Sequence, residues 1–227
     1  MARLYVIIAV MTKKKSVKHP VSPALEQAYD ESADRLGQTL LYQFPSALKW
    51  IGKGRASKKL YAWSRKILRR DTFDADALAT WINEWIVRDA QCPLEERQIH
   101  DAVLLAQLTP FLTQYMDILR WGQLVTHLLD YESLGCELHP KESPLKFAIA
   151  GTELPIVLQC YHRALSESTS LNRAAKNMIV SLEESLGDDA LPHANMLDGF
   201  QEVLASWTRF YFSYQECSDI TSSREDI

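Results

Sequence analysis

The chain has few of the residues that punctuate a turn-rich fold. Its 227 residues include eight Gly and nine Pro, which favours long regular elements over a β architecture with many turns. Cysteine is also sparse, and no two of the four cysteines form a CxxC pair: they are Cys92, Cys136, Cys160 and Cys217. In a chain of this size, such spacing predicts reduced thiols in a reducing compartment rather than a disulfide framework.

Long apolar runs are lacking as well. The run near the start, residues 4–11, would span about 12 Å as a helix, whereas a bilayer core is about 30 Å thick. Lysines follow this run, where a secretory signal would carry a small-residue cleavage site. Three interpretations of residues 1–10 stay open: a short strand, a flexible extension, or translated sequence upstream of a true start at Met11. We expect residues 1–22 to be a flexible basic extension of a cytoplasmic protein without a transmembrane segment.

Apolar periodicity predicts helices along nearly the whole chain. The strongest stripe is Leu78, Trp81, Ile82, Trp85 and Ile86, at the i, i+3, i+4, i+7, i+8 spacing of an amphipathic helix. We expect an all-α protein, a multi-helix bundle or array of seven to nine helices. The expected helices cover residues 23–43, 57–70, 74–90, 93–109, 111–131, 153–168, 170–187 and 194–217, with short pieces near 48–50 and 144–151.

Breaks between helices follow from proline and glycine. Pro110 is expected to kink or restart its helix, and Gly187 to end one in the left-handed conformation. Residues 132–144 contain Gly135, Pro140 and Pro144, which makes them the clearest predicted loop. We therefore expect a single helical domain over residues 23–217, with 132–144 as the place where it would divide into two halves. Residues 218–227 are expected to be a frayed tail.

Charge is sorted by position along the chain. Residues 1–70 carry fifteen Lys and Arg against four Asp and Glu, a balance of +11, and residues 71–227 carry ten against twenty-five, a balance of −15. The net charge of −4 hides this difference. Such a division suggests that the two parts face different partners, or each other.

The basic excess is concentrated in residues 53–70, which contain no acid. The eight basic residues are Lys53, Arg55, Lys58, Lys59, Arg65, Lys66, Arg69 and Arg70. On a helix at about 100° per residue, the last six fall within one arc, and the opposite side carries Leu60, Tyr61, Trp63, Ile67 and Leu68. One side of this helix is therefore expected to dock on a core while the other presents a dense cationic surface.

The start of this basic helix is electrostatically unfavourable. Lys58 and Lys59 lie in the first turn, where the helix dipole is positive, and a bound anion would remove the conflict. Gly52 and Gly54 precede the helix and would let backbone N–H groups approach a phosphate. The eight basic residues are thus a candidate polyanion site. Residues 52–54 do not have the spacing of a Walker A loop or a dinucleotide fingerprint.

Four interpretations compete for the basic helix. Nucleic acid fits because phosphates favour closely spaced Lys and Arg. An anionic membrane surface and a calmodulin-like groove also accept a basic amphipathic helix. In the fourth interpretation the cations are simply solvated, or are covered by the acidic remainder of the same chain.

Catalytic motifs are not evident. Two pairs have helical spacing, Glu96 with His100 and His127 with Asp130, and their side chains could be combined with Cys92 into a metal cluster. However, the sequence contains neither HExxH nor a second Glu-x-x-His. We expect these residues to be surface or hydrogen-bonded groups, with no metal and no cofactor. No GxSxG elbow occurs. Cys160 and His162 would point apart on a helix, and Cys160 is expected in the core.

The last expected helix carries an aromatic stripe. Its members include Trp207, Tyr211 and Tyr214, which are candidates for contact with a protein partner or a second copy. The favoured interpretation is nevertheless an intramolecular core. Phe212 lies outside the stripe, which suggests a second apolar side on this helix.

The leading functional hypothesis is a non-enzymatic binding or adaptor protein that contacts nucleic acid or another polyanion through residues 53–70. The alternative is a helical scaffold or oligomer that acts through its C-terminal aromatic helix. The third is a helical-bundle enzyme without a recognisable site. The chain does not resemble a known family closely enough for one to be named from its residues.

Overall fold

A computed structural model of the chain describes residues 21–34, 57–91, 94–162 and 170–225. The expected all-α class is confirmed: the described residues form eight α-helices of eight or more residues. These are α2 (Pro23–Asp34), α4 (Lys58–Arg69), α5 (Ala75–Gln91), α6 (Glu96–Leu112), α7 (Ile118–Cys136), α9 (Leu154–Tyr161), α10 (Ser170–Ser185) and α11 (Phe200–Glu225). Shorter pieces are α8 (Pro144–Lys146), the π-helix η3 (Phe147–Glu153) and the 3₁₀ turn η4 (Ala194–Met196).

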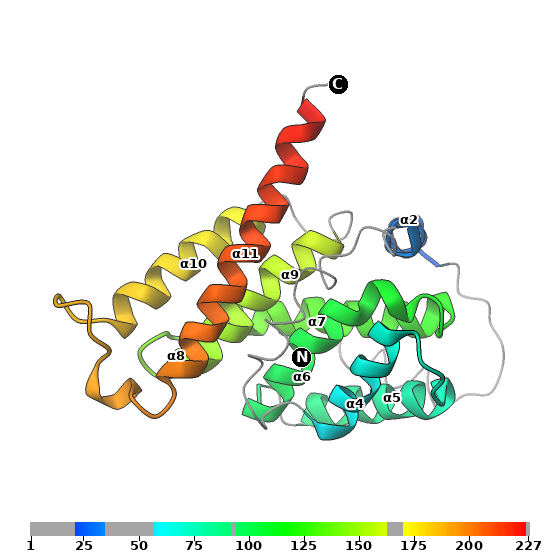
Figure 1. The fold of residues 1–227 in the computed structure, drawn as a ribbon, viewed down its shortest axis with the longest axis horizontal. Helices are drawn as coiled ribbons and strands as arrows, with labels where there is room; N and C mark the ends of the chain where they lie inside the picture. The colour runs from blue at the N-terminus through cyan, green and yellow to red at the C-terminus, as the bar shows by residue number, and fades with distance from the viewer. Residues whose placement is uncertain (1–20, 35–56, 92–93, 163–169, 226–227) are drawn as a thin grey trace.

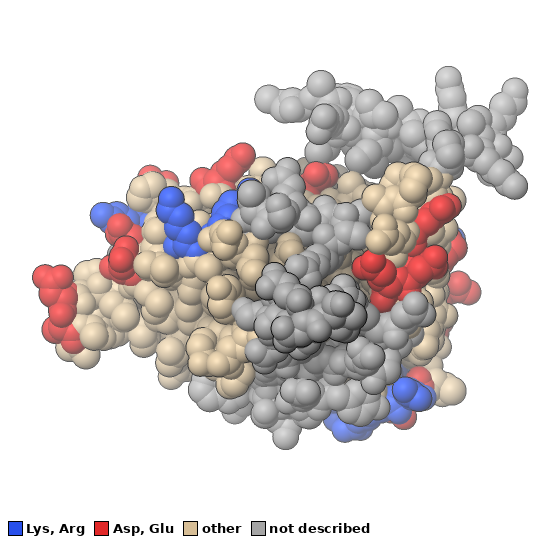
Figure 2. Space-filling model, turned by 90° about the horizontal axis from the view of Figure 1, so that it is seen from above, with Lys and Arg blue, Asp and Glu red and all other residues tan. Residues whose placement is uncertain are grey.

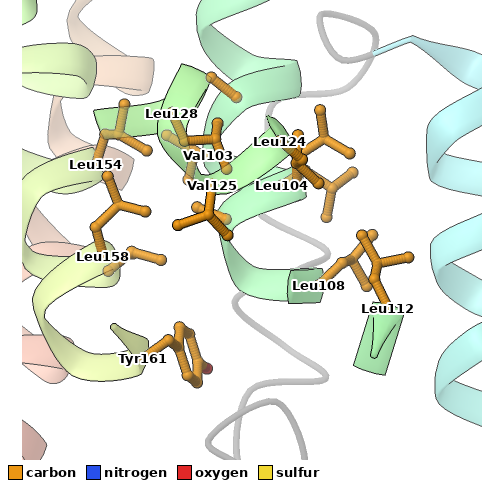
Figure 3. Close-up of a cluster of buried hydrophobic side chains, with 14 of the residues drawn as sticks. Val103, Leu104, Leu108, Leu112, Leu124, Val125, Leu128, Leu154, Leu158 and Tyr161 are labelled. Atoms are coloured by element: carbon orange, nitrogen blue, oxygen red, sulfur yellow. The ribbon is translucent and has the colours of Figure 1, made fainter. Parts of the chain in front are cut away.

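The core is built around α6, of which nearly every residue from Gln98 onward is buried. Leucine and valine side chains of α6, α7 and α9 meet there (Figure 3). Helices α4 and α5 lie together on one side of this centre, and α10 and α11 on the other (Figure 1). The central hydrophobic cluster includes side chains from all eight long helices. The proposed domain over residues 23–217 stays a prediction.

Pro110 does not restart its helix, which was one of the two expected outcomes, but lies inside α6. Helix α6 continues to Leu112, and the chain turns only afterwards, with the Asp117 carboxylate accepting the N–H groups of Leu119 and Arg120 at the start of α7. Proline removes the N–H that would bond to the carbonyl four residues earlier. The Thr109 hydroxyl donates to that Ala106 carbonyl instead, at 2.6 Å. A neighbouring side chain therefore replaces the lost backbone bond.

The predicted loop at 132–144 is partly wrong, because α7 runs on to Cys136. Gly135 is buried within α7, where a Cβ atom would lie 2.5 Å from the backbone of Ala150. This glycine is a close-approach residue and not a turn residue. Gly151 likewise does not stop a helix, since it lies inside η3, which continues directly into α9.

The π-helix η3 is buried over its whole length. Side chains of neighbouring helices donate hydrogen bonds to its carbonyl groups. Ser206 of α11 donates its hydroxyl to the Ala148 carbonyl, and the Asn177 amide of α10 donates to the Gly151 carbonyl, each at 2.9 Å. The C-terminal helices therefore depend on η3 for specific polar contacts as well as for apolar packing.

The C-terminal part differs from expectation in three places. Helix α10 ends at Ser185, and the left-handed residue in the following turn is Ala190, with φ of 59°, and not Gly187. Helix α11 begins at Phe200 and is helical up to Glu225, through most of the expected tail. Cys160 is buried as expected but is disulfide-bonded, which contradicts the prediction of four reduced thiols. Pairing depends on the distance between Cα atoms, which sequence spacing does not reveal.

Two further expectations concern the N-terminal part. Helix α2 begins at Pro23 as predicted, but its expected continuation to residue 43 lies outside the described residues, as does most of the 1–22 extension. Among the described helices, none has the length and apolar character needed to cross a bilayer.

Candidate polyanion interface

Helix α4 forms as the sequence predicts, from Ser57 as N-cap to Arg70. Arg70 is the C-cap in the left-handed conformation, with φ of 56°. Its N–H bonds to the Ile67 carbonyl, and the Asp71 N–H bonds to the Lys66 carbonyl. These bonds satisfy carbonyls that a helix end would otherwise leave free. The helix is thus closed by its own backbone, and its last turn keeps basic side chains next to the negative end of the dipole.

The apolar side of α4 is docked on the core. Leu60 is fully buried, Ile67 is 2% exposed and Trp63 is 8% exposed. The indole of Trp63 meets that of Trp81 on α5 edge-on, with ring centroids 5.9 Å apart. Each fully buried side chain of this size contributes about 1.5–3 kcal/mol of hydrophobic stabilisation. Packing therefore determines which side of α4 faces inward.

The opposite side of α4 carries six exposed cations, called here the cationic face: Lys58, Lys59, Arg65, Lys66, Arg69 and Arg70. Within the part of the chain that the structure describes, none of the six forms an ion pair. The Lys59 ammonium lies 5.1 Å from the centroid of the Trp63 ring, a cation–π contact. The other two candidates, Lys53 and Arg55, lie outside the described residues, as do Gly52 and Gly54.

A carboxylate of the protein itself accepts a backbone N–H at the start of α4. The backbone N–H of Ser57 donates to the Asp101 carboxylate of α6 at 2.7 Å, and the Ser57 side chain makes no cap bond. Burial raises the pKa of Asp101 to about 6, although the Ser57 bond and the nearby Arg97 and Arg88 act to lower it. Sequence reasoning missed Asp101, since nothing in its spacing points to a helix start forty-four residues earlier.

Charges on the described surface form separate groups. Figure 2 shows Asp and Glu gathered on the side where α2 lies in Figure 1, and again at the tip beyond α10. The turn after α10 contains Asp188 and Asp189, both exposed. Lys and Arg form other small groups on this face (Figure 2). The described surface therefore carries acidic and basic groups in separate places.

Comparison with known proteins does not identify a family. No family model, no curated protein and no solved structure matches the chain.

His100 and His127 have partners other than those that the sequence predicted. His127 lies 2.8 Å from the Asp89 carboxylate of α5 and not with Asp130, and His100 lies 3.8 Å from the Glu202 carboxylate of α11. Cys92 lies outside the described residues. Among the described side chains, no group of three His, Cys, Asp or Glu is arranged to hold a metal ion. The two histidines are part of helix-to-helix contacts.

A buried ion pair joins η3 to α11. The Arg209 guanidinium donates from Nε and Nη2 to the two carboxylate oxygens of Glu153, and both side chains are buried. A bidentate pair of this kind has strict geometry. Its partners are fifty-six residues apart, so no local sequence pattern could have found it.

The C-terminal aromatic candidates have three different environments. Trp207 is buried in a second hydrophobic cluster, with its Nε1–H donated to the Ser181 hydroxyl at 3.1 Å. Tyr214 is partly buried and stacks on Phe210. Tyr211 is 56% exposed and the neighbouring Phe212 is 44% exposed. Of the three candidates, only Tyr211 has a side chain that is exposed on the surface. The neighbouring Phe212 side chain is exposed next to it.

Proposed function

We propose that this protein binds nucleic acid through the cationic face of α4. The observation that carries the proposal is the division of α4 into an apolar side docked on the core and an exposed cationic side that forms no ion pair with the described residues. Cations that the protein does not neutralise with its own described acids are available for phosphate oxygens.

The burial of Leu60, Trp63 and Ile67 weighs against two of the competing partners. An interfacial amphipathic helix inserts its apolar side into lipid. A calmodulin-like groove takes up the same side of its target helix. In this protein that side is occupied by the core, so either partner would require α4 to detach. Phosphate contacts through the cationic face require no such change.

The cationic face is also of a suitable size. From Lys58 to Arg70 a helix rises about 18 Å, and its six cations span an arc of about 140°. If all six cations contact phosphates of duplex DNA, a plot of the logarithm of the association constant against the logarithm of the salt concentration should have a slope of about −5. Binding with this salt dependence would be clear at low salt and weak at high salt.

The test is fluorescence anisotropy with labelled DNA and RNA over a range of salt concentrations. In one variant, four of the cations are changed together to alanine: Lys58, Lys59, Arg65 and Lys66. The matched control is Lys176→Ala, at an exposed position of α10. The fourfold variant should reduce the magnitude of the salt slope by about 3 to 4, and the control should leave it unchanged. Circular dichroism checks that the helices remain.

Two results would contradict the proposal. One is the lack of binding to both nucleic acids at low salt. The other is binding that the fourfold variant does not weaken. Vesicles that contain anionic lipid serve as a further probe, and binding to vesicles without binding to nucleic acid would also count against it.

A second candidate function is protein contact through α11. Tyr211, Phe212 and Leu204 are all exposed on this helix, the last at 42%, and exposed aromatic residues are enriched at protein interfaces. Sedimentation equilibrium of the purified protein tests self-association. A dimer that dissociates when Tyr211 and Phe212 are changed to glutamine would support this function, and a monomer at every concentration would contradict self-association.

A further inference from the structure

We infer that the cationic face of α4 binds double-stranded nucleic acid by contacting phosphates of both strands across a groove, without dependence on base sequence. This inference rests on the proposed function and specifies its ligand. It is carried by three features of α4: the spacing of its cations, the environment of its aromatic residues, and the way its first residue is held.

The cations of α4 form two groups with a gap between them. Lys58 and Lys59 lie in the first turn, and Arg65, Lys66 and the two arginines that follow lie in the last turns. Ala62 is exposed near the middle of the same face. The rise from Lys58 to Arg65 is about 10 Å, close to the roughly 12 Å width of the major groove of B-DNA. Two groups at this separation fit the two rows of phosphates that border a groove.

Neither aromatic residue of α4 has an exposed ring face like those on which unpaired bases stack: Trp63 is buried and Tyr61 is partly buried. The exposed side chains of this fully described helix are Lys, Arg and Ala. Proteins that bind single strands combine basic grooves with aromatic side chains on which bases stack. A convex row of cations without such a platform favours the duplex, in which the phosphates are regularly spaced and the bases are already stacked.

The start of α4 is bonded to the protein, which disfavours entry into a groove end-first. Recognition helices of helix-turn-helix proteins present residues of their N-terminal part to base edges. In α4 the N–H of Ser57 is bonded to the buried carboxylate of Asp101. We therefore expect the helix to lie across the nucleic acid on its side, where Lys and Arg reach phosphates, and phosphate contacts carry no sequence information.

The experiment compares a labelled DNA duplex, each of its single strands and a duplex of shuffled sequence by anisotropy at one low salt concentration. We expect the duplex to bind at least about tenfold more tightly than either strand, and the shuffled duplex to bind within about threefold of the original.

A charge placed in the gap provides a second, independent readout. Ala62→Glu introduces a carboxylate between the two groups of cations, and the matched control is Ala24→Glu on an exposed position of α2. Ala62→Glu should weaken duplex binding by about tenfold or more, whereas Ala24→Glu should not.

The outcomes separate this inference from the proposed function. If single strands bind as tightly as the duplex and the fourfold alanine variant abolishes both, the proposed function stands and this inference is overturned. A strong preference between the two duplex sequences overturns it as well. If neither duplex nor strands bind, both fail. If Ala62→Glu leaves duplex affinity unchanged, the two-strand contact is refuted while nucleic-acid binding is retained.

Discussion

Changing Asp101 to asparagine is expected to stabilise the protein at neutral pH. The Asp101 carboxylate is buried and accepts the Ser57 N–H. Asparagine has the same shape, and its side-chain oxygen can accept the same bond. It resembles the protonated acid and carries no charge to desolvate. The change therefore isolates the cost of keeping a charge in this place.

The magnitude follows from the pKa of Asp101. Burial raises this pKa from an ordinary 3.8 to about 6, and each unit corresponds to about 1.36 kcal/mol. The folded protein binds the proton more tightly than the unfolded chain, so the free energy of unfolding falls as pH rises from about 4 to about 6. Above that range, ionised Asp101 costs about 3 kcal/mol relative to its neutral form.

Urea unfolding followed by tryptophan fluorescence measures the effect. At about pH 8, Asp101→Asn should raise the free energy of unfolding by as much as about 3 kcal/mol, and at about pH 4 the gain should be close to zero. Asp130→Asn is the matched control, because Asp130 is exposed on α7. Its effect should stay within about 0.5 kcal/mol at both pH values.

The reasoning would be refuted if Asp101→Asn lowered stability at about pH 8, or if its gain were the same at both pH values. Asp101→Ala separates the charge from the hydrogen bond. Alanine removes the charge but leaves the Ser57 N–H without its acceptor, so it should be less stable than the asparagine variant by about 1–3 kcal/mol. Equal stability of the two variants would show that the Ser57 bond contributes little.

Three other predictions follow from the core. Glu153→Gln removes the carboxylate that forms the bidentate pair with the buried Arg209 guanidinium and should cost about 3–5 kcal/mol of unfolding free energy in urea titrations; a loss below about 1 kcal/mol would contradict this. Gly135→Ala should lower the melting temperature, because its Cβ would lie 2.5 Å from the Ala150 backbone, whereas Gly199→Ala, with open space around it, should not. Because Cys160 is disulfide-bonded, thiol titration of denatured protein should count two fewer thiols before reduction than after.

Much of the helical framework could be predicted from local patterns. The stripe in residues 74–90 formed α5, with Leu78, Trp81, Ile82 and Trp85 buried. Residues 57–70 formed α4, with its cations outward and its apolar side inward. Both results depend on a period of 3.6 residues and on the burial of apolar area, which are properties of neighbours in sequence.

Proline and glycine were less reliable than apolar periodicity for predicting where helices end. Pro110 remains inside α6 because the Thr109 hydroxyl satisfies the carbonyl that proline leaves free, and Gly135 remains inside α7 because Ala150 packs against it. In each case the deciding atom belongs to a neighbouring side chain or another helix. A rule that considers proline or glycine alone cannot include it.

The sequence alone determined the all-α class, the approximate positions of the long helices, and the separation of cations from apolar residues on α4. These are local consequences of composition and spacing. Only the tertiary structure decided what each face meets: Asp101 at the start of α4, Glu153 opposite Arg209, and Trp207 in the core while Tyr211 stays exposed. Such pairings join residues far apart in the chain, and their energies depend on distance and burial, which sequence spacing does not contain.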